Sequence, residues 1–140
     1  MSEYNKTLVR RFYEAVENQG NLELVDELFD VNFRDSHNTV APFPVVGPEA
    51  VKKLAGALKH LFDFHCEIED LIAEGDRVVA RISGHITHKN DFMGVPATGK
   101  QLPTNGVEIF RVANGKLVER WVFIDQLPTI RELGLLQESH

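Results

Sequence analysis

The sequence predicts an α+β fold in which N-terminal helices and one curved antiparallel sheet enclose a pocket. Apolar residues recur every three or four positions in the first part of the chain and every second position after Phe62, which indicates helices followed by strands. Segregation of helices and strands along the chain is typical of α+β proteins. The 140 residues suit one domain, which we expect to span residues 1–140.

Three helices are expected in the first part of the chain, at residues 5–18, 22–29 and 48–62. The first has an apolar stripe at helical spacing, and Gly20 is placed to end it as a C′ glycine. Residues 31–37 form a brief extended segment, and the two prolines within residues 38–47 indicate a loop. Pro48 suits the first turn of the third helix, where its missing N–H is not needed.

Four further strands are expected in the second part, at residues 64–69, 77–88, 101–112 and 116–124. The dipeptides at 75–76 and 114–115 are turns, and the Asn-Gly of the second is a type I′ hairpin signal. Residues 90–100 contain two glycines and one proline and indicate a connecting loop. A short C-terminal helix is expected over residues 128–133, with Gly134 at its end.

The hairpin turn predicts the register of the last two strands. If Asn114-Gly115 forms a two-residue loop, the facing pairs are Ala113–Lys116, Phe110–Glu119, Glu108–Trp121, Gly106–Phe123 and Thr104–Asp125. The eight residues of the last four pairs would share one face of the sheet. The opposite face, which would carry Arg120, is also substantially apolar and therefore needs a second cover. A homodimer through this outer face is the simplest solution for so short a chain.

Composition limits the partners that we expect. The formal net charge is -6, which does not suit a nucleic-acid-binding surface, so no nucleic acid is expected. Cys66 is the only cysteine, which excludes an intrachain disulfide. No apolar run approaches the roughly 20 residues that span a bilayer, and the first residues lack the features of a signal peptide. We therefore expect a cytoplasmic protein that does not contact a membrane.

Asp125, at the end of the last predicted strand, is the main catalytic candidate. In the predicted register it lies beside Trp121 and Phe123, where loss of solvent would make the carboxylate hold a proton more tightly. A general base that works near neutral pH requires such a change. The alternative is that Asp125 caps the C-terminal helix.

The same predicted face supplies candidate residues for binding a ligand. Trp121, Phe123 and Phe110 would form apolar walls. Glu108 either lines the pocket or takes part in an internal ion pair, for which Arg81 is the candidate partner.

Tyr13, His37 and His88 complete the set of candidates. Tyr13 lies on the apolar stripe of the first helix, so its phenol either donates a hydrogen bond in the pocket or packs in the core. His37 and His88 lie near the ends of extended segments, where each is either a proton carrier, a hydrogen-bond donor or a surface histidine. His85 and His88 would point to opposite faces of a strand and no metal-binding motif is present, so no metal site is expected.

Several segments resemble those of SnoaL-like polyketide cyclases, and together they cover nearly the whole chain. They are FYEAV at 12–16, GNL at 20–22, VDEL at 25–28, FMGVPATGK at 92–100, GVEIFRV at 106–112, and NGKLVERW at 114–121 followed by Asp125. The Gly-Thr-His-x-Gly segment that is usual in the family is ITHKN at 86–90 here, without either glycine.

The resemblance implies the cone-like fold of the nuclear-transport-factor-2-like superfamily and chemistry that needs no cofactor. It implies that Asp125 is the general acid and base of an intramolecular aldol cyclisation of a polyketide ester. In that reaction the aspartate removes a proton from a carbon next to carbonyl groups. By position, His88 resembles a pocket histidine of the family and His37 resembles one near the entrance.

The sequence therefore supports three functional hypotheses. The first is a cofactor-free cyclase-type enzyme that acts on a small hydrophobic carbonyl compound, with Asp125 as acid and base. His88, His37 and Tyr13 would position its substrate. The second is a non-catalytic domain that binds a small ligand or forms dimers. The third is a proton shuttle similar to steroid isomerases, with Tyr13 as the oxyanion donor and Asp35 as the candidate base.

Overall fold

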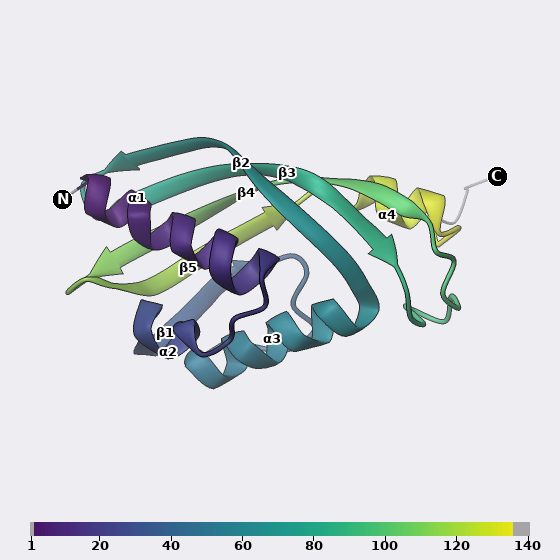
Figure 1. The fold of residues 1–140 in the computed structure, drawn as a ribbon, viewed down its shortest axis with the longest axis horizontal. Helices are drawn as coiled ribbons and strands as arrows, with labels where there is room; N and C mark the ends of the chain where they lie inside the picture. Colours follow the sequence, from purple (N-terminus) through teal and green to yellow (C-terminus); the bar gives the residue numbers. More distant parts are fainter. Residues whose placement is uncertain (1, 136–140) are drawn as a thin grey trace.

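The computed structural model describes residues 2–135, in which five strands form one mixed sheet (Figure 1). The strands are β1 (Phe29–Asn38), β2 (Phe62–Glu74), β3 (Arg77–His88), β4 (Gln101–Ala113) and β5 (Lys116–Ile124). Their order in the sheet is β1-β5-β4-β3-β2. Neighbouring strands are antiparallel except β1 and β5, which are parallel. The predicted α+β class is confirmed, and the bounds of β3 and β5 are those that the sequence predicts.

The helical segments are α1 (Ser2–Arg11), its π-helical continuation η1 (Phe12–Asn18), α2 (Leu24–Leu28), α3 (Pro48–Leu61) and α4 (Leu127–Glu132). Gly20 follows η1 with a φ of +73°, a conformation that glycine adopts without strain. Pro48 occupies the first turn of α3, as expected. Within residues 2–135, none of these helices is long and apolar enough to cross a membrane.

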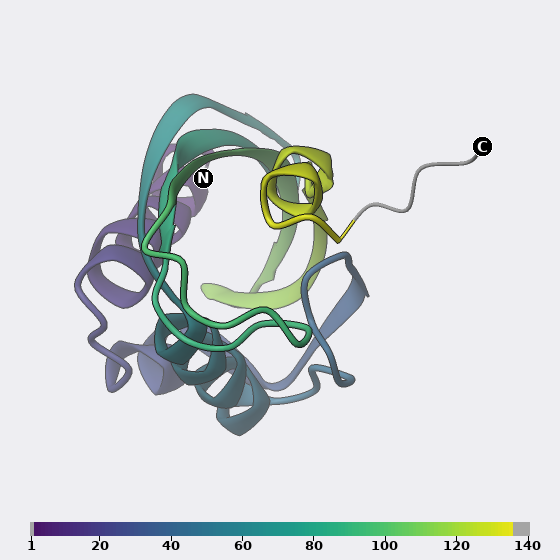
Figure 2. The ribbon, with the colours of Figure 1, turned by 90° about the vertical axis from the view of Figure 1, so that its right-hand side faces the viewer.

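The helices and the concave face of the sheet surround a common core. The helix α1 contacts β2 and β3, whereas α3 contacts both edge strands, β1 and β2. Viewed from one end, the sheet curls around on itself and α3 lies on the side that the sheet leaves open (Figure 2). At the centre, Phe12, Phe29, Phe33 and Phe110 are at most 1% exposed and pack edge to face. This core holds the sheet in the cone shape that the family resemblance implies.

Asn18 attaches η1 to the edge strand β2. Its side-chain amide donates to the backbone oxygen of Cys66, and its side-chain oxygen accepts from the backbone N–H of Cys66, both at 2.9 Å. These bonds satisfy backbone groups that an edge strand otherwise leaves unpaired. They also fix η1 against the sheet, so that Tyr13 is buried and Glu17 faces the interior.

The β4–β5 hairpin contains a β-bulge that we did not predict. Arg111 pairs with Glu119, but the next pair is Val112–Leu117, so Val118 is an extra residue on β5. Beyond the bulge the pairs are Phe110–Arg120, Ile109–Trp121, Glu108–Val122, Val107–Phe123 and Gly106–Ile124. The predicted register is therefore wrong by one residue.

The one-residue difference exchanges the two faces of β5, because side chains alternate along a strand. Arg120 and Val122 are buried on the inner face, so the expectation that Arg120 lies outside is wrong. Trp121 and Phe123 lie on the outer face, where Phe123 is 44% exposed. The expectation that these two aromatic residues line the pocket beside Asp125 is also wrong.

Candidate active site

An apolar cavity of about 160 Å³ lies between the concave face of the sheet and the helices. Its apolar wall consists of Val40, Leu58, Phe62, Phe64, Ile82, Ile86, Phe92, Val122 and Ile124. Its remaining side chains are Glu17, Cys66, Thr104, Glu108, Asp125, Gln126 and Thr129. A cavity of about 150 Å³ in another protein is large enough to hold benzene. The enclosed volume therefore suits a ligand fragment about the size of one aromatic ring.

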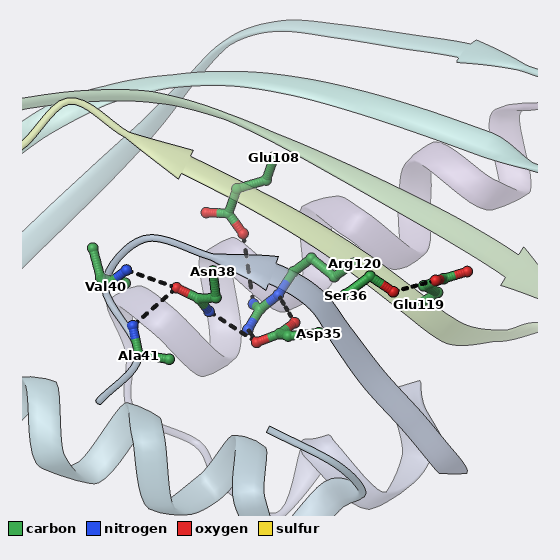
Figure 3. Close-up of polar contacts among 8 residues, drawn as sticks. All are labelled: Asp35, Ser36, Asn38, Val40, Ala41, Glu108, Glu119 and Arg120. Atoms are coloured by element: carbon green, nitrogen blue, oxygen red, sulfur yellow. Dashed lines mark hydrogen bonds and ion pairs between the residues drawn. The ribbon is translucent and has the colours of Figure 1, made fainter. Parts of the chain in front are cut away.

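A buried ion pair supports the inner end of this site. Asp35 on β1 lies directly opposite Arg120 on β5 in the parallel ladder. Arg120 Nε donates to Asp35 Oδ1 at 2.7 Å and Nη2 donates to Oδ2 at 2.8 Å, the two-pronged geometry that makes such pairs strong. Asn38 Nδ2 also donates to Asp35 Oδ2, at 2.8 Å (Figure 3). The pair joins the edge strand β1 to β5, and both Asp35 oxygens accept hydrogen bonds.

Glu108 on β4 faces the same guanidinium. Arg120 Nη1 lies 3.5 Å from Glu108 Oε1, and the Glu108 side chain is only 8% exposed (Figure 3). Burial raises the pKa of Glu108 to about 7; Arg120 opposes this change and Glu17 adds to it. Glu108 therefore exchanges a proton near neutral pH, as an acid or base in an active site must. Its predicted partner Arg81 is wrong, because Arg81 Nε instead donates to Asp70 Oδ2 at 2.6 Å.

Glu17 and Tyr13 on η1 lie close to Glu108. We call the part of the cavity wall that Glu17 and Glu108 form the cavity floor. Glu17 lines the cavity, and burial raises its pKa, whereas Arg120 and Lys59 lower it. The Tyr13 hydroxyl is buried beside the carboxyl group of Glu108, although within residues 2–135 it forms no hydrogen bond of ordinary geometry. Burial, followed by the charge of Glu108, raises the pKa of Tyr13 well above the usual value. Sequence reasoning missed Glu17, although its position four residues after Tyr13 on a helix placed the two side chains on one face.

Asp125 both lines the cavity and accepts a hydrogen bond from the first residue of α4. It lines the cavity and is solvent-exposed, so it lies where the cavity meets solvent. Its Oδ1 also accepts from the backbone N–H of Leu127 at the start of α4, at 3.2 Å. On its outer side it borders a groove that Arg81 and Phe123 also line.

Neither candidate histidine is among the residues that line the cavity. His88 is fully buried, and its Nδ1 accepts from the backbone N–H of Thr98 at 3.3 Å and contacts the Thr98 hydroxyl at 3.0 Å. It therefore holds the loop after β3, and it is not among the residues that line the cavity. His37 lies on the exposed outer side, where its ring stacks on Phe123 at 4.7 Å between centroids.

The positions of Phe110 and Trp121 follow from the core and from the bulge in β5. Phe110 is fully buried against Phe12 and Tyr13 and belongs to the core rather than to the cavity wall. Trp121 is partly buried beneath the guanidinium of Arg77, 4.9 Å from the ring centroid. Within residues 2–135 no group of three His, Cys, Asp or Glu side chains is arranged to hold a metal ion.

The fold consists of a curved sheet and helices around an apolar cavity, with carboxyl groups on the cavity wall. This is the architecture of a nuclear-transport-factor-2-like pocket protein. Within that class, the family model of SnoaL-like polyketide cyclases matches residues 7–133. The chain belongs to this family.

Individual relatives agree with this assignment. Aklanonic acid methyl ester cyclase DnrD of Streptomyces peucetius is 29% identical over 129 residues, which cover 91% of this chain and 88% of that protein. The crystal structure of AclR, a candidate hydroxylase of Streptomyces galilaeus, is 30% identical with a TM-score of 0.82, covering 98% of this chain and 100% of that one. A candidate polyketide cyclase of Acidithiobacillus ferrooxidans has a TM-score of 0.85 at 27% identity, covering 94% of each chain.

Proposed function

We propose that the chain is a cofactor-free cyclase-type enzyme that performs acid/base chemistry on a small hydrophobic carbonyl compound. The observation that carries this proposal is an apolar cavity with one buried carboxyl group, Glu108, and one exposed carboxyl group, Asp125, on its wall. Membership of the SnoaL-like family and similarity to an aklanonic acid methyl ester cyclase support the reaction type.

In the proposed reaction, the Asp125 carboxylate removes a proton from a carbon next to a carbonyl group of the ligand. The enolate carbon then attacks a second carbonyl carbon of the same molecule, and a C–C bond forms. The oxygen of the attacked carbonyl takes the proton back from Asp125, so the product is an isomer of the substrate. Glu108, which is partly protonated near neutral pH, would donate a hydrogen bond to the enolate oxygen.

The first test is the ring closure of aklanonic acid methyl ester, followed by chromatography, with Asp125→Asn and wild-type protein. A positioned general base contributes about 100-fold or more to a rate, so we expect kcat to fall by at least that factor. Glu74→Gln, which alters an exposed carboxyl group at the far end of β2, is the matched control. Unchanged turnover by Asp125→Asn would rule out the proposed role of Asp125.

A non-catalytic ligand-binding domain is the second candidate, and the hydrogen bond from Leu127 N–H to Asp125 favours it. If Asp125 only caps α4, Asp125→Asn should leave ring closure unchanged and lower the free energy of unfolding by about 1 kcal/mol or less. The isomerase-like hypothesis gains no comparable support, because its candidate base Asp35 is held in the buried pair with Arg120.

We further propose that two copies associate through the outer face of the sheet. Phe123 is 44% exposed there, and Trp121, Ile109 and Val107 are only partly buried on the same face. Phe123→Glu should convert a dimer into a monomer in sedimentation experiments. Met93→Glu, on the loop after β3 and 69% exposed, should not. A monomeric wild-type protein would refute the proposal.

A further inference from the structure

We propose that Glu17 and Glu108 make the cavity selective for uncharged carbonyl ligands over carboxylates of the same shape. The inference rests on the proposed function in one respect, since both require that the cavity holds a ligand. It goes further by assigning specificity to two residues, one of which, Glu17, has no role in the proposed reaction.

Arg120 offers little free positive charge to a ligand. Its Nε and Nη2 are occupied by Asp35 at 2.7 and 2.8 Å, and its Nη1 faces Glu108 at 3.5 Å. A guanidinium that already holds a carboxylate by two hydrogen bonds is locally neutralised. The carboxyl groups of Glu17 and Glu108 therefore determine the charge that a ligand meets at the cavity floor.

These two carboxyl groups face the cavity with unused hydrogen-bonding capacity. The Glu108 side chain is 8% exposed, and its Oε1 has no hydrogen-bond partner within residues 2–135. Glu17 lines the same cavity from η1, and no side chain in the described part of the chain forms a hydrogen bond with its carboxyl group. A ligand that reaches the floor meets both groups.

Other groups around the floor do not reverse this charge balance. Lys59 on α3 is near enough to Glu17 to lower its pKa, but it is not among the residues that line the cavity. Burial raises the pKa of the Cys66 thiol on β2 to about 12, so the thiol is uncharged. Tyr13 on η1 is likewise neutral, because burial raises its pKa. No Lys or Arg side chain of residues 2–135 lines the cavity, whereas the carboxyl groups of Glu17 and Glu108 do.

A ligand carboxylate would therefore find no cation on the cavity wall to pair with. It would also be repelled by the ionised fraction of the two carboxyl groups, in a space whose walls are apolar and whose dielectric constant is low. Both conditions disfavour an anion. An uncharged carbonyl oxygen avoids this cost and can accept a hydrogen bond from a protonated Glu108 or Glu17. Like charges that face each other across a binding surface are a known means of rejecting unwanted partners.

Acetophenone and benzoate provide a matched test, because they have nearly the same shape. The methyl group of acetophenone is replaced in benzoate by a negatively charged oxygen. Dissociation constants would be measured with the full chain at pH 7 by NMR chemical-shift titration. We expect acetophenone to bind to the wild-type protein at least about tenfold more tightly than benzoate. A tenfold ratio of dissociation constants can be measured by this titration even when both ligands bind weakly. In Glu17→Gln and Glu108→Gln, tested singly and together, benzoate should gain affinity while acetophenone changes less. Glu74→Gln should retain the wild-type preference.

Four other outcomes would each contradict a part of this proposal. Equal binding of the two probes, or tighter binding of benzoate, would overturn the selectivity and leave the proposed reaction untouched. Tighter binding of benzylammonium than of acetophenone would also overturn it, because the floor would then act as a cation site. A preference that persists in the double variant would overturn the assignment to Glu17 and Glu108. Absence of binding by all three probes would count against the cavity as a ligand site and thus against the proposed function itself.

Discussion

Replacement of Glu108 by glutamine should change how the stability of the protein depends on pH. Burial raises the pKa of Glu108 from 4.5 to about 7 in the folded protein, whereas the unfolded chain exposes the group to water. Between these two values the folded protein binds more protons than the unfolded chain. The free energy of unfolding must therefore fall as the pH rises through this window.

The magnitude follows from the same two values. A tenfold change in proton affinity corresponds to about 1.4 kcal/mol, so the raised pKa of Glu108 costs the folded wild type up to about 3 kcal/mol above neutral pH. Glutamine has nearly the same shape but does not titrate, so this cost is absent in Glu108→Gln. The free energy of unfolding of the variant, relative to wild type, should increase by up to about 3 kcal/mol between pH 5 and pH 8.

Urea unfolding followed by circular dichroism at several pH values would measure this difference. Titrating groups that do not interact with Glu108 affect both proteins equally and cancel in the comparison. Glu74→Gln, at an exposed site, should give a curve parallel to that of wild type. If Glu108→Gln also gives a parallel curve from pH 5 to pH 8, the Glu108 carboxyl group is not held in the protonated form by burial.

Three further predictions concern other parts of the structure. Arg120→Met leaves the buried carboxylate of Asp35 without its partner and should cost about 3–5 kcal/mol in chemical unfolding; a loss below about 1 kcal/mol would contradict the buried pair. Gly84→Ala places a Cβ against the backbone oxygen of His65 on β2 and should cost about 2 kcal/mol or more in chemical unfolding. Gly56→Ala, with open space in α3, should instead stabilise by about 0.5–1 kcal/mol. The thiol of Cys66 should react far more slowly with iodoacetamide at pH 8 in the folded protein than in urea. Burial raises its pKa to about 12, and the thiolate is the reactive form. Equal rates would contradict the burial of this thiol.

Local patterns in the sequence were sufficient to predict the fold class and most of the elements. The ends of β3 and β5 agree with the predicted strands, and Gly20 and Pro48 flank helices as expected. Such signals depend on a few neighbouring residues, so no knowledge of distant contacts is needed. Asp125 does line the cavity, but the hairpin register from which we predicted this position is wrong by one residue.

The composition of the site was decided only by the tertiary structure. The extra residue Val118 reverses the parity of β5, which moves Trp121 outward and brings Arg120 into the interior. A bulge of this kind leaves the alternation on either side intact, so periodicity does not reveal it. The Arg120–Asp35 pair joins residues that are 85 positions apart. They meet because β1 and β5 are parallel neighbours, and no hairpin turn in the sequence predicts that pairing. The sequence by itself thus determined the helices, the strands and the turn chemistry, because those depend on local backbone preferences. Only the folded chain decided which carboxyl groups are buried around one guanidinium, because burial depends on every element that packs against them.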